Sequence, residues 1–327
     1  MINGFHRLFD PGHWFRSSFS HGIHPTENKH FTANKPIQRF PFAPELILPL
    51  SQHAGAPSEP LVHLGQEVLR GEPIAKAAGF MSVPQHAPAT GVIKKIELMP
   101  TSKGPRTLSI ILEVYPGDSQ EVRYSQARDV DAMSPQEIVQ AVQDTGLVGL
   151  GGAAFPTHVK LSPPKGHKVH TVLINGCECE PFLTTDHRIM VEYPDRVHFG
   201  IRVMMQCLGV SRAVIGVEDN KPDAVEMLRR TIPEDLDITV RSLTVKYPQG
   251  AEKMLIKALV DREVPSGKLP MHVGTVVQNV GSIATIAEVF ETGYPLIERV
   301  VTVSGPGVVR PSNLIVPVGT KIRDLLD

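Results

Sequence analysis

The stretch GLVGLGGAAFPTHVK, residues 146–160, is the most informative part of this 327-residue sequence. Glycine and alanine dominate its first nine residues, although the rest of the chain is not glycine-repetitive. Backbone without large side chains lets N–H groups approach an anion closely, and Lys160 adds a positive charge nearby. The stretch therefore indicates a phosphate cradle, and a glycine-rich loop kept only for tight packing is the plainer alternative.

The loop also contains the spacing Gly149-x-Gly151-x-x-Ala154, which matches the dinucleotide-binding fingerprint. That fingerprint requires a strand before it and a helix after it. Here the capping serine and early proline of residues 134–137 predict a helix before the loop, and Pro156 interrupts any helix after it. We therefore interpret the loop as a phosphate cradle that does not belong to a dinucleotide-binding fingerprint.

Outward from the loop, strands alternate with helices, which predicts an α/β layer with a mostly parallel sheet. The predicted strands cover residues 169–175, 212–217 and 238–245, and the predicted helices cover residues 136–145, 194–208, 221–230 and 250–260. This layer is expected to form a domain over residues 119–298.

A second informative stretch, VLINGCECEP at residues 172–181, is an apolar strand followed by polar side chains. Ligands of open α/β sheets bind at the carboxyl ends of the strands. Two thiols make half of a tetrahedral metal site and nothing nearby completes it, so no metal is expected. We interpret the carboxylates as hydrogen-bond acceptors for a polar ring edge or ribose hydroxyls. A strand-end turn with exposed glutamates is the alternative.

Two later stretches carry weaker signals. In YPQGAEK, residues 247–253, a turn precedes a helix, and Tyr247 is able to pack on a planar ring. In VVQNVGS, residues 276–282, the amides of Gln278 and Asn279 follow an apolar run and can hydrogen-bond phosphate or ring carbonyls.

The part before the α/β layer is predicted to be β-structure over residues 45–118, because short apolar runs alternate with Gly and Pro turns. Residues 62–75 and 87–93 resemble a biotinyl or lipoyl-like barrel-sandwich domain. The place of the carrier lysine falls near Phe80, so carrier chemistry is expected to be absent.

The two ends of the sequence are less regular. Residues 1–44 are expected to form an irregular extension that wraps a partner or its own domain, and His21-x-x-His24 is interpreted as loop histidines rather than metal ligands. Residues 299–327 return to β-structure and begin a small domain that the sequence does not finish.

Composition excludes several classes of protein. Apolar residues make up 41%, charged residues 20%, and the net charge is −1, which argues against disorder and against a nucleic-acid protein. Neither a spanning apolar run nor a secretory signal is present. Three cysteines favour a reducing compartment and cannot hold a [4Fe–4S] cluster, which needs four ligands.

Taken in order, the four stretches resemble the FMN- and NADH-binding subunit of respiratory complex I. The whole chain resembles more closely the RnfC family, the C subunits of the Rnf complexes, which are membrane-bound, ion-translocating ferredoxin–NAD oxidoreductases. Residues 22–29 (GIHPTENK) and 49–57 (PLSQHAGAP) carry this second resemblance together with the central motifs. The resemblance implies that residues 299–327 begin a β-grasp (SLBB) domain and that cysteine clusters for [4Fe–4S] centres follow in a longer chain.

The resemblance also implies roles for individual residues. Those expected to line the FMN phosphate and ribityl chain are Gly149, Gly151, Gly152 and Ala153, with Lys160 beside the flavin. Those expected around the flavin ring and the nicotinamide are Asn175, Cys177, Glu178 and Glu180, and the two glutamates are the expected catalytic residues. Those expected to close the site are Tyr247, Gly250 and Glu252, and those expected to hold FMN from the other side are Gln278, Asn279 and Ser282. Three residues depart from the complex I pattern: Cys177 replaces an Asp, Ala251 a Glu and Ala154 a Gly.

The implied function is hydride transfer between NAD(H) and FMN, followed by electron transfer to iron–sulfur clusters. The implied place is peripheral, on the cytoplasmic side of the inner membrane, with the other Rnf subunits and a ferredoxin-type carrier as partners. A non-catalytic adaptor, similar to the A subunit of the sodium-translocating NADH–quinone reductase, is the first alternative. A structural scaffold that docks membrane subunits is the second, and it is compatible with the main interpretation.

Overall fold

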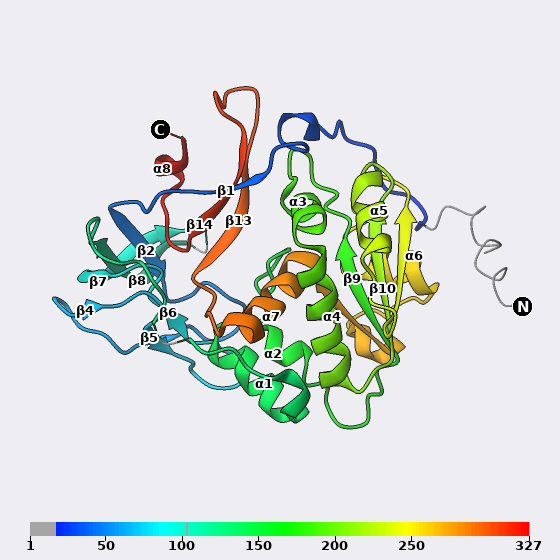
Figure 1. Cartoon of the computed structure of the whole chain (residues 1–327), viewed down its shortest axis with the longest axis horizontal. Coiled ribbons are helices and arrows are strands. Elements are labelled where there is room, and N and C mark those ends of the chain that lie inside the picture. The colour runs from blue at the N-terminus through cyan, green and yellow to red at the C-terminus, as the bar shows by residue number, and fades with distance from the viewer. Residues whose placement is uncertain (1–17, 103, 124, 327) are drawn as a thin grey trace, which may run out of the picture.

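The computed structural model describes residues 18–102, 104–123 and 125–326. A central α/β domain lies beside a smaller β-domain, and the strands of the C-terminal part lie between them along one side (Figure 1). Within the described residues, no helix combines the length and the hydropathy needed to cross a membrane.

The central sheet is parallel and has the strand order β11-β10-β9-β12. Its strands are β9 (Thr171–Gly176), β10 (Arg212–Glu218), β11 (Asp237–Leu243) and β12 (Thr275–Asn279). Alternate residues of β9 face opposite layers: Val172 and Ile174 pack in one core, and Leu173 packs in another. Both faces of the sheet are therefore covered, which explains why its strands are continuous apolar runs.

Helices form the two outer layers. The core on one face includes residues of α4 (Pro194–Leu208), α5 (Pro222–Arg230) and α7 (Val280–Thr292), and the core on the other face includes α6 (Glu252–Val260). The domain also contains α1 (Pro135–Asp144), α2 (Thr157–Lys160) and α3 (Thr185–Glu192), and the short 3-10 helices η3 (Val130–Ala132) and η4 (Pro270–Val273). The capping serine predicted for α1 is confirmed, since Ser134 Oγ accepts from Glu137 N–H.

The barrel-sandwich fold predicted for the β-domain is confirmed. One sheet has the order β2-β8-β7-β4 and the other β3-β5-β6. The strands are β2 (Glu45–Pro49), β3 (Glu59–Pro60), β4 (Glu67–Val68), β5 (Pro73–Lys76), β6 (Gln85–His86), β7 (Gly91–Thr101) and β8 (Gly104–Val114). A separate apolar cluster, which includes Leu46, Ile74 and Leu112, fills the space between the sheets.

The N-terminal extension is more ordered than expected, within its described part from residue 18. It contains η2 (Lys29–Phe31) and β1 (Ile37–Arg39). Strand β1 pairs in parallel with β14 (Ser312–Pro317), which pairs antiparallel with β13 (Glu298–Val303). The final element is α8 (Ile322–Leu326). The extension thus wraps its own chain and completes a three-stranded sheet with the C-terminal strands.

Candidate functional site

The glycine-rich loop lies against the carboxyl ends of β9 and β12. Asn175 on β9 and Asn279 on β12 are register partners, so their side chains leave the sheet at the same edge. A Cβ on Gly151 would lie 2.7 Å from Asn279 Nδ2, which shows how closely the loop backbone packs on this edge. Gly152 has nothing within 4 Å of its Cβ position and faces open space. The structure therefore places the glycine-rich loop, Asn175 and Asn279 together at the carboxyl edge of the sheet.

The backbone of the loop is held at Leu150. Its N–H donates to Ser282 Oγ at 2.8 Å, and Ser282 N–H donates to Asn279 Oδ1, which caps α7. Within the described residues, the amides of Gly151, Gly152 and Ala153 have no acceptor, and all three residues are exposed. A row of free N–H groups beside an open space is suited to bind an anion such as phosphate.

Lys160, the cation predicted for the site, already has two partners among the described residues. Lys160 Nζ lies 3.0 Å from Glu252 Oε1 and donates to the Val277 carbonyl oxygen at 2.9 Å. Gln278 is buried and donates to Thr157 Oγ1 at 3.2 Å. Lys160, Glu252 and Gln278 thus tie α2, α6 and β12 together beneath the loop.

Asn175 connects the strand end to the 247–252 turn. Its Nδ2 donates to the Gly250 carbonyl oxygen at 2.7 Å, and its Oδ1 accepts from Cys177 N–H. Tyr247 is 38% exposed, and its backbone exchanges two hydrogen bonds with Ile23 of the N-terminal extension. The structure therefore brings Tyr247 and Gly250 to the same edge as Asn175.

Two residues of the CECE stretch are turned away from open space. The Cys177 thiol is fully buried and donates to the Gly216 carbonyl oxygen, and burial raises the pKa of this thiol well above its usual value. The Glu178 carboxylate is also buried and accepts from the N–H groups of Asp186 and His187 at 2.7 and 3.4 Å. Cys177 is thus a core side chain, and Glu178 caps the first turn of α3.

Glu180 differs from Glu178 because its side chain is exposed. Among the described residues its carboxylate makes no hydrogen bond and no ion pair, which leaves it free to meet a ligand. Of the two predicted catalytic glutamates, only Glu180 has an exposed carboxylate without a partner among the described residues.

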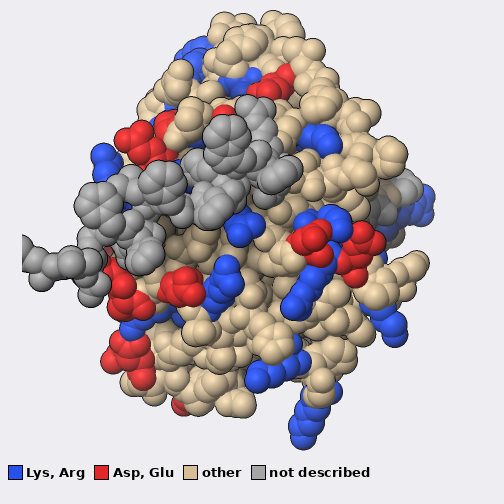
Figure 2. All heavy atoms as spheres, turned by 90° about the vertical axis from the view of Figure 1, so that its right-hand side faces the viewer, with Lys and Arg blue, Asp and Glu red and all other residues tan. Residues whose placement is uncertain are grey.

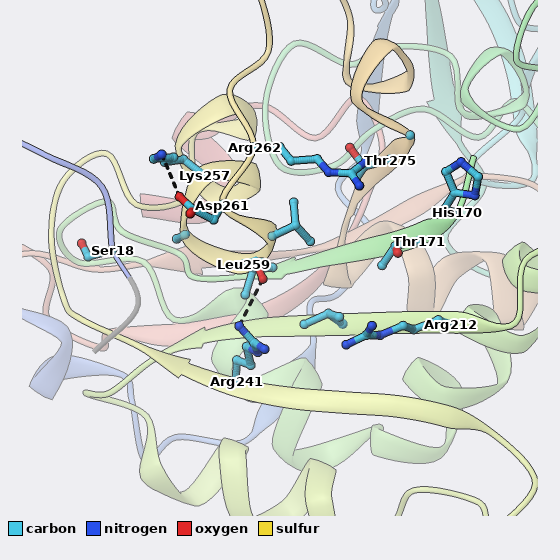
Figure 3. A pocket seen from close by; sticks show the side chains of 14 residues that line it. Ser18, His170, Thr171, Arg212, Arg241, Lys257, Leu259, Asp261, Arg262 and Thr275 are labelled. Carbon is cyan, nitrogen blue, oxygen red and sulfur yellow. Dashed lines mark hydrogen bonds and ion pairs between the residues drawn. The ribbon is translucent and has the colours of Figure 1, made fainter. Parts of the chain in front are cut away.

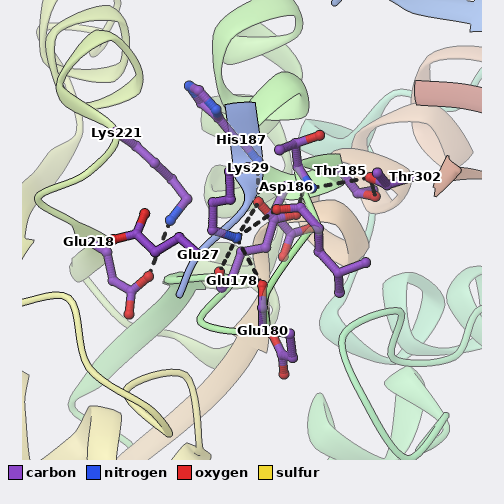
Figure 4. A network of polar contacts seen from close by, with 12 residues as sticks. Glu27, Lys29, Glu178, Glu180, Thr185, Asp186, His187, Glu218, Lys221 and Thr302 are labelled. Carbon is purple, nitrogen blue, oxygen red and sulfur yellow. Dashed lines mark hydrogen bonds and ion pairs between the residues drawn. The ribbon is translucent and has the colours of Figure 1, made fainter. Parts of the chain in front are cut away.

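Two buried lysines, neither of them predicted as site residues, shape the backbone of this stretch (Figure 4). Lys29 Nζ donates to the carbonyl oxygens of Glu178, Glu180 and Leu183 at 2.8, 3.0 and 2.6 Å. Lys221 Nζ donates to the Cys177 carbonyl oxygen at 2.6 Å and lies 3.2 Å from the Glu218 carboxylate. The stretch is therefore fixed from both sides by ammonium groups.

Asp186 and Arg299 also lie at the site without having been predicted. Asp186 Oδ2 accepts from Asn279 Nδ2 at 2.6 Å, and Arg299 Nη2 donates to the Leu150 carbonyl oxygen at 3.0 Å. Burial raises the pKa of Asp186 to about 7, and the Glu178 carboxylate adds to this shift. The sequence signal for Asp186 was weak, since it follows two threonines that gave no clear helix start.

The β-domain contacts the loop from the far side. Ala54 N–H donates to the Ala154 carbonyl oxygen at 3.0 Å, and the His158 ring nitrogen Nε2 lies 2.8 Å from the Phe80 carbonyl oxygen. The Phe80 ring meets the His158 ring edge to face. The tip that was compared with a lipoyl carrier therefore supports the loop instead.

A separate cavity of about 600 Å³ lies at the opposite edge of the sheet (Figure 3). It is lined by the first residues of three strands, Thr171, Arg212 and Thr275, and by Arg241 and Arg262. Figure 2, which views the molecule from the α6 side, shows lysine and arginine interspersed with acidic side chains. None of the predicted site residues lines this cavity.

Comparisons with known families agree with this architecture. The Nuo51 FMN-binding domain family matches residues 142–288, and the RnfC barrel sandwich hybrid domain family matches residues 17–115. The NAD+-reducing [NiFe]-hydrogenase in its air-oxidized state has the same fold over 60% of this chain and 41% of that chain, with a TM-score of 0.51 and 24% identity. The fold predicted for the central domain is thereby confirmed.

Curated relatives cover nearly the whole chain. The C subunit of the proton-translocating ferredoxin:NAD(+) oxidoreductase complex of Clostridium ljungdahlii is 43% identical, over 95% of this chain and 68% of the relative. The C subunit of the Na(+)-translocating complex of Acetobacterium woodii is 42% identical, over 95% of this chain and 70% of the relative. The C subunit of the ion-translocating oxidoreductase complex of Citrobacter koseri is 38% identical, over 94% of this chain but only 44% of the relative.

The resemblance drawn from the four sequence stretches is confirmed by these relatives, and the site lies in the part of the chain that the FMN-binding family covers. The chain therefore belongs to the RnfC family, the C subunits of the ion-translocating ferredoxin:NAD(+) oxidoreductase (Rnf) complexes.

Proposed function

We propose that this chain is the subunit in which NAD(H) and FMN exchange electrons within a ferredoxin:NAD(+) oxidoreductase complex. The observation that carries the proposal is the row of free amides at Gly151, Gly152 and Ala153, beside the open space at the carboxyl edge of the parallel sheet. The relatives that are named as subunits of such complexes support the same assignment.

The residues at this edge fit a flavin mononucleotide. The free amides would bind the phosphate, and the amide groups of Asn175 and Asn279 would border the ring and the ribityl chain. When bound, FMN supplies the redox chemistry, because it exchanges a hydride with NAD(H) and single electrons with iron–sulfur clusters. The protein supplies position and electrostatics.

Glu180 and Tyr247 are the residues proposed for the nicotinamide side. The Glu180 carboxylate is free to accept hydrogen bonds from ribose hydroxyls, and the exposed Tyr247 ring is available to pack on a planar ring. For Glu178 the contacts favour another role than the catalytic one implied by the resemblance, because its carboxylate accepts from the Asp186 N–H at the start of α3. We assign it a structural role and leave Glu180 as the carboxylate that meets substrate.

The wider setting is part of the same proposal. We place the chain peripherally on the cytoplasmic side of the membrane, in contact with other subunits of the complex. Its electrons would pass to iron–sulfur clusters outside residues 1–327 and from there to or from a ferredoxin-type carrier.

The test is to release any bound small molecule from the purified chain by heat and to compare its absorbance and fluorescence with an FMN standard. We expect one FMN per chain, or one after FMN is added back, and anaerobic bleaching of the flavin by NADH. Failure to bind added FMN would contradict the proposal and would favour the adaptor alternative.

A pair of glycine variants sharpens the test. Gly151→Ala places a Cβ 2.7 Å from Asn279 Nδ2, so we expect it to displace the loop and abolish flavin binding. Gly117→Ala is the matched control, because its Cβ position has nothing within 4 Å. Equal flavin content in both variants would contradict the placement of the phosphate cradle.

A further inference from the structure

The free amides of the glycine loop carry only partial positive charge, and a phosphate dianion is held more firmly when a full cation stands beside it. The cation predicted from the sequence does not fill this role. Lys160 lies 3.0 Å from Glu252 and donates to the Val277 carbonyl oxygen, so its charge is neutralised beneath the loop.

Arg299 lies beside the loop with its charge uncompensated. Its Nη2 donates to the Leu150 carbonyl oxygen at 3.0 Å, next to the free amides that begin at Gly151. Arg299 is exposed, and no carboxylate of the described residues lies within ion-pair distance of it. A single hydrogen bond leaves most of the five guanidinium donors free.

The position of Arg299 on strand β13 fixes the direction in which its side chain points. Successive side chains of a strand point to opposite faces. On β13 the preceding residue, Glu298, points to Arg39 and Arg70, with oxygen–nitrogen distances of 2.6 Å to each. This pair of contacts holds Glu298 on one face and therefore turns Arg299 to the other, toward the loop.

The charge of Asp186 acts on Arg299, but the Asp186 carboxylate already has a hydrogen-bond partner of its own. Its carboxylate accepts from Asn279 Nδ2 at 2.6 Å. Because burial raises its pKa to about 7, it carries only part of a negative charge at neutral pH. Arg299 thus keeps a net positive field at the mouth of the cradle.

We propose that Arg299 binds the phosphate of the flavin held on the glycine loop, and so is a cofactor-binding residue supplied by the C-terminal strands. This inference rests on the proposed function. Arg299 lies outside residues 142–288, the part that the FMN-binding family matches, so the central domain depends on β13 for the cation of its site.

The experiment compares FMN with riboflavin, which lacks the phosphate, in the wild-type chain and in Arg299→Gln. Dissociation constants are measured by quenching of flavin fluorescence. We expect Arg299→Gln to weaken FMN binding roughly 10- to 100-fold and to leave riboflavin binding within about 2-fold. We also expect the salt dependence of FMN binding to become shallower. Retained riboflavin binding shows that the variant is folded at the site.

Two further variants complete the design. Arg310→Gln removes an exposed arginine from the loop that joins β13 to β14, and both flavins should bind it as they bind the wild type. Arg299→Lys keeps a point charge without the guanidinium fork, and it should recover part of the preference for FMN over riboflavin.

The outcomes separate the two claims. Unchanged FMN affinity in Arg299→Gln, or an equal loss for FMN and riboflavin, overturns the role of Arg299 and leaves the proposed function intact. An effect of Arg299→Gln on NADH affinity alone would assign the guanidinium to the nicotinamide dinucleotide and would also overturn it. A wild-type chain that binds neither flavin overturns the proposed function and this inference with it.

Discussion

Ala154, at the end of the glycine loop, has a backbone conformation that alanine seldom adopts. Its φ is 50°, in the left-handed region, where a Cβ approaches the following carbonyl oxygen. The complex I pattern has glycine at this position, and the carbonyl oxygen of Ala154 accepts from Ala54 N–H of the β-domain. The site therefore holds one strained residue at the point where two domains meet.

This strain predicts that Ala154→Gly stabilises the chain without flavin, by up to about 1 kcal/mol. Ala153→Gly is the matched control, because Ala153 has no positive φ and glycine there only adds freedom to the unfolded chain. Urea unfolding of both variants would measure the difference. A loss of stability in Ala154→Gly comparable to that in Ala153→Gly would contradict the interpretation.

Single residues also mark how far the sequence could predict the site. The loop, Asn175 and Asn279 were predicted because their residue types and order are specific. The directions of the Cys177 and Glu178 side chains were not predicted. They depend on the backbone conformation after the strand ends, where Glu178 has a φ of 50°. Arg299 gave no signal, since only the sheet formed with β1 and β14 places it beside the loop.

At the scale of elements, the N-terminal segment acts as an ordered part of the site. Lys29 is 8% exposed and satisfies three carbonyl oxygens of the strand-end stretch. Phe182 N–H donates to the Glu27 carbonyl oxygen, and Ile23 pairs with Tyr247. The segment therefore holds both stretches that we assign to the nicotinamide side.

Replacing the buried lysine should reveal this dependence. Lys29→Met leaves the three carbonyl oxygens without a donor, and we expect a loss of about 3 kcal/mol of unfolding free energy. Lys35→Met is the control: Lys35 is exposed and donates to one carbonyl oxygen, so its loss should cost within about 0.5 kcal/mol. Chemical denaturation of both variants compares them, and equal losses would be inconsistent with the proposed role.

Helices that have both a start signal and a stop signal in their own sequence were predicted closely. The helix over 194–208 has Pro at its first position and Gly209 in the left-handed conformation after its end, and it spans the same residues in the structure. Helix α3 was missed because its first turn is capped by Glu178 from outside the element. Helix α7 was missed because it is buried on most sides and has only a narrow polar stripe.

At the scale of the whole molecule, the contact between the domains contains a half-buried histidine. His86 of the β-domain lies beside Gly146 at the start of the glycine-rich stretch, and its Nδ1 is buried without a hydrogen-bond partner among the described residues. Burial lowers the pKa of His86 to about 4. The folded chain therefore holds this ring neutral at pH values where the unfolded chain protonates it.

The sign of the resulting pH dependence is fixed by this lowered pKa. The part of the folding stability that depends on a neutral His86 ring is fully present above about pH 6.5, the pKa of an unfolded histidine. This part is lost as the pH falls toward 4. We expect His86→Gln to lose less stability than the wild type between pH 7 and pH 4.5. The exposed His63→Gln should behave as the wild type, and thermal unfolding at several pH values would compare all three.

The sequence predicted the domain types but not their arrangement. Barrel-sandwich and α/β patterns are local, whereas the contacts between domains depend on groups far apart in the chain. Glu298 pairs with Arg39 and Arg70, which come from two other parts of the sequence. Such pairs leave no pattern of spacing, so they become visible only in the folded chain.

The pairing of β1 with β14 has a consequence for how this protein is made. Residues 37–39 leave the ribosome long before their strand partners, residues 313–315, are synthesised. The Asn313 side chain also donates to the Thr32 carbonyl oxygen across 281 positions. The segment around β1 must therefore wait, exposed or shielded by a chaperone, until translation has passed β14. Products of translation that stalls before β14 would expose this segment, which makes them natural targets for cellular proteolysis.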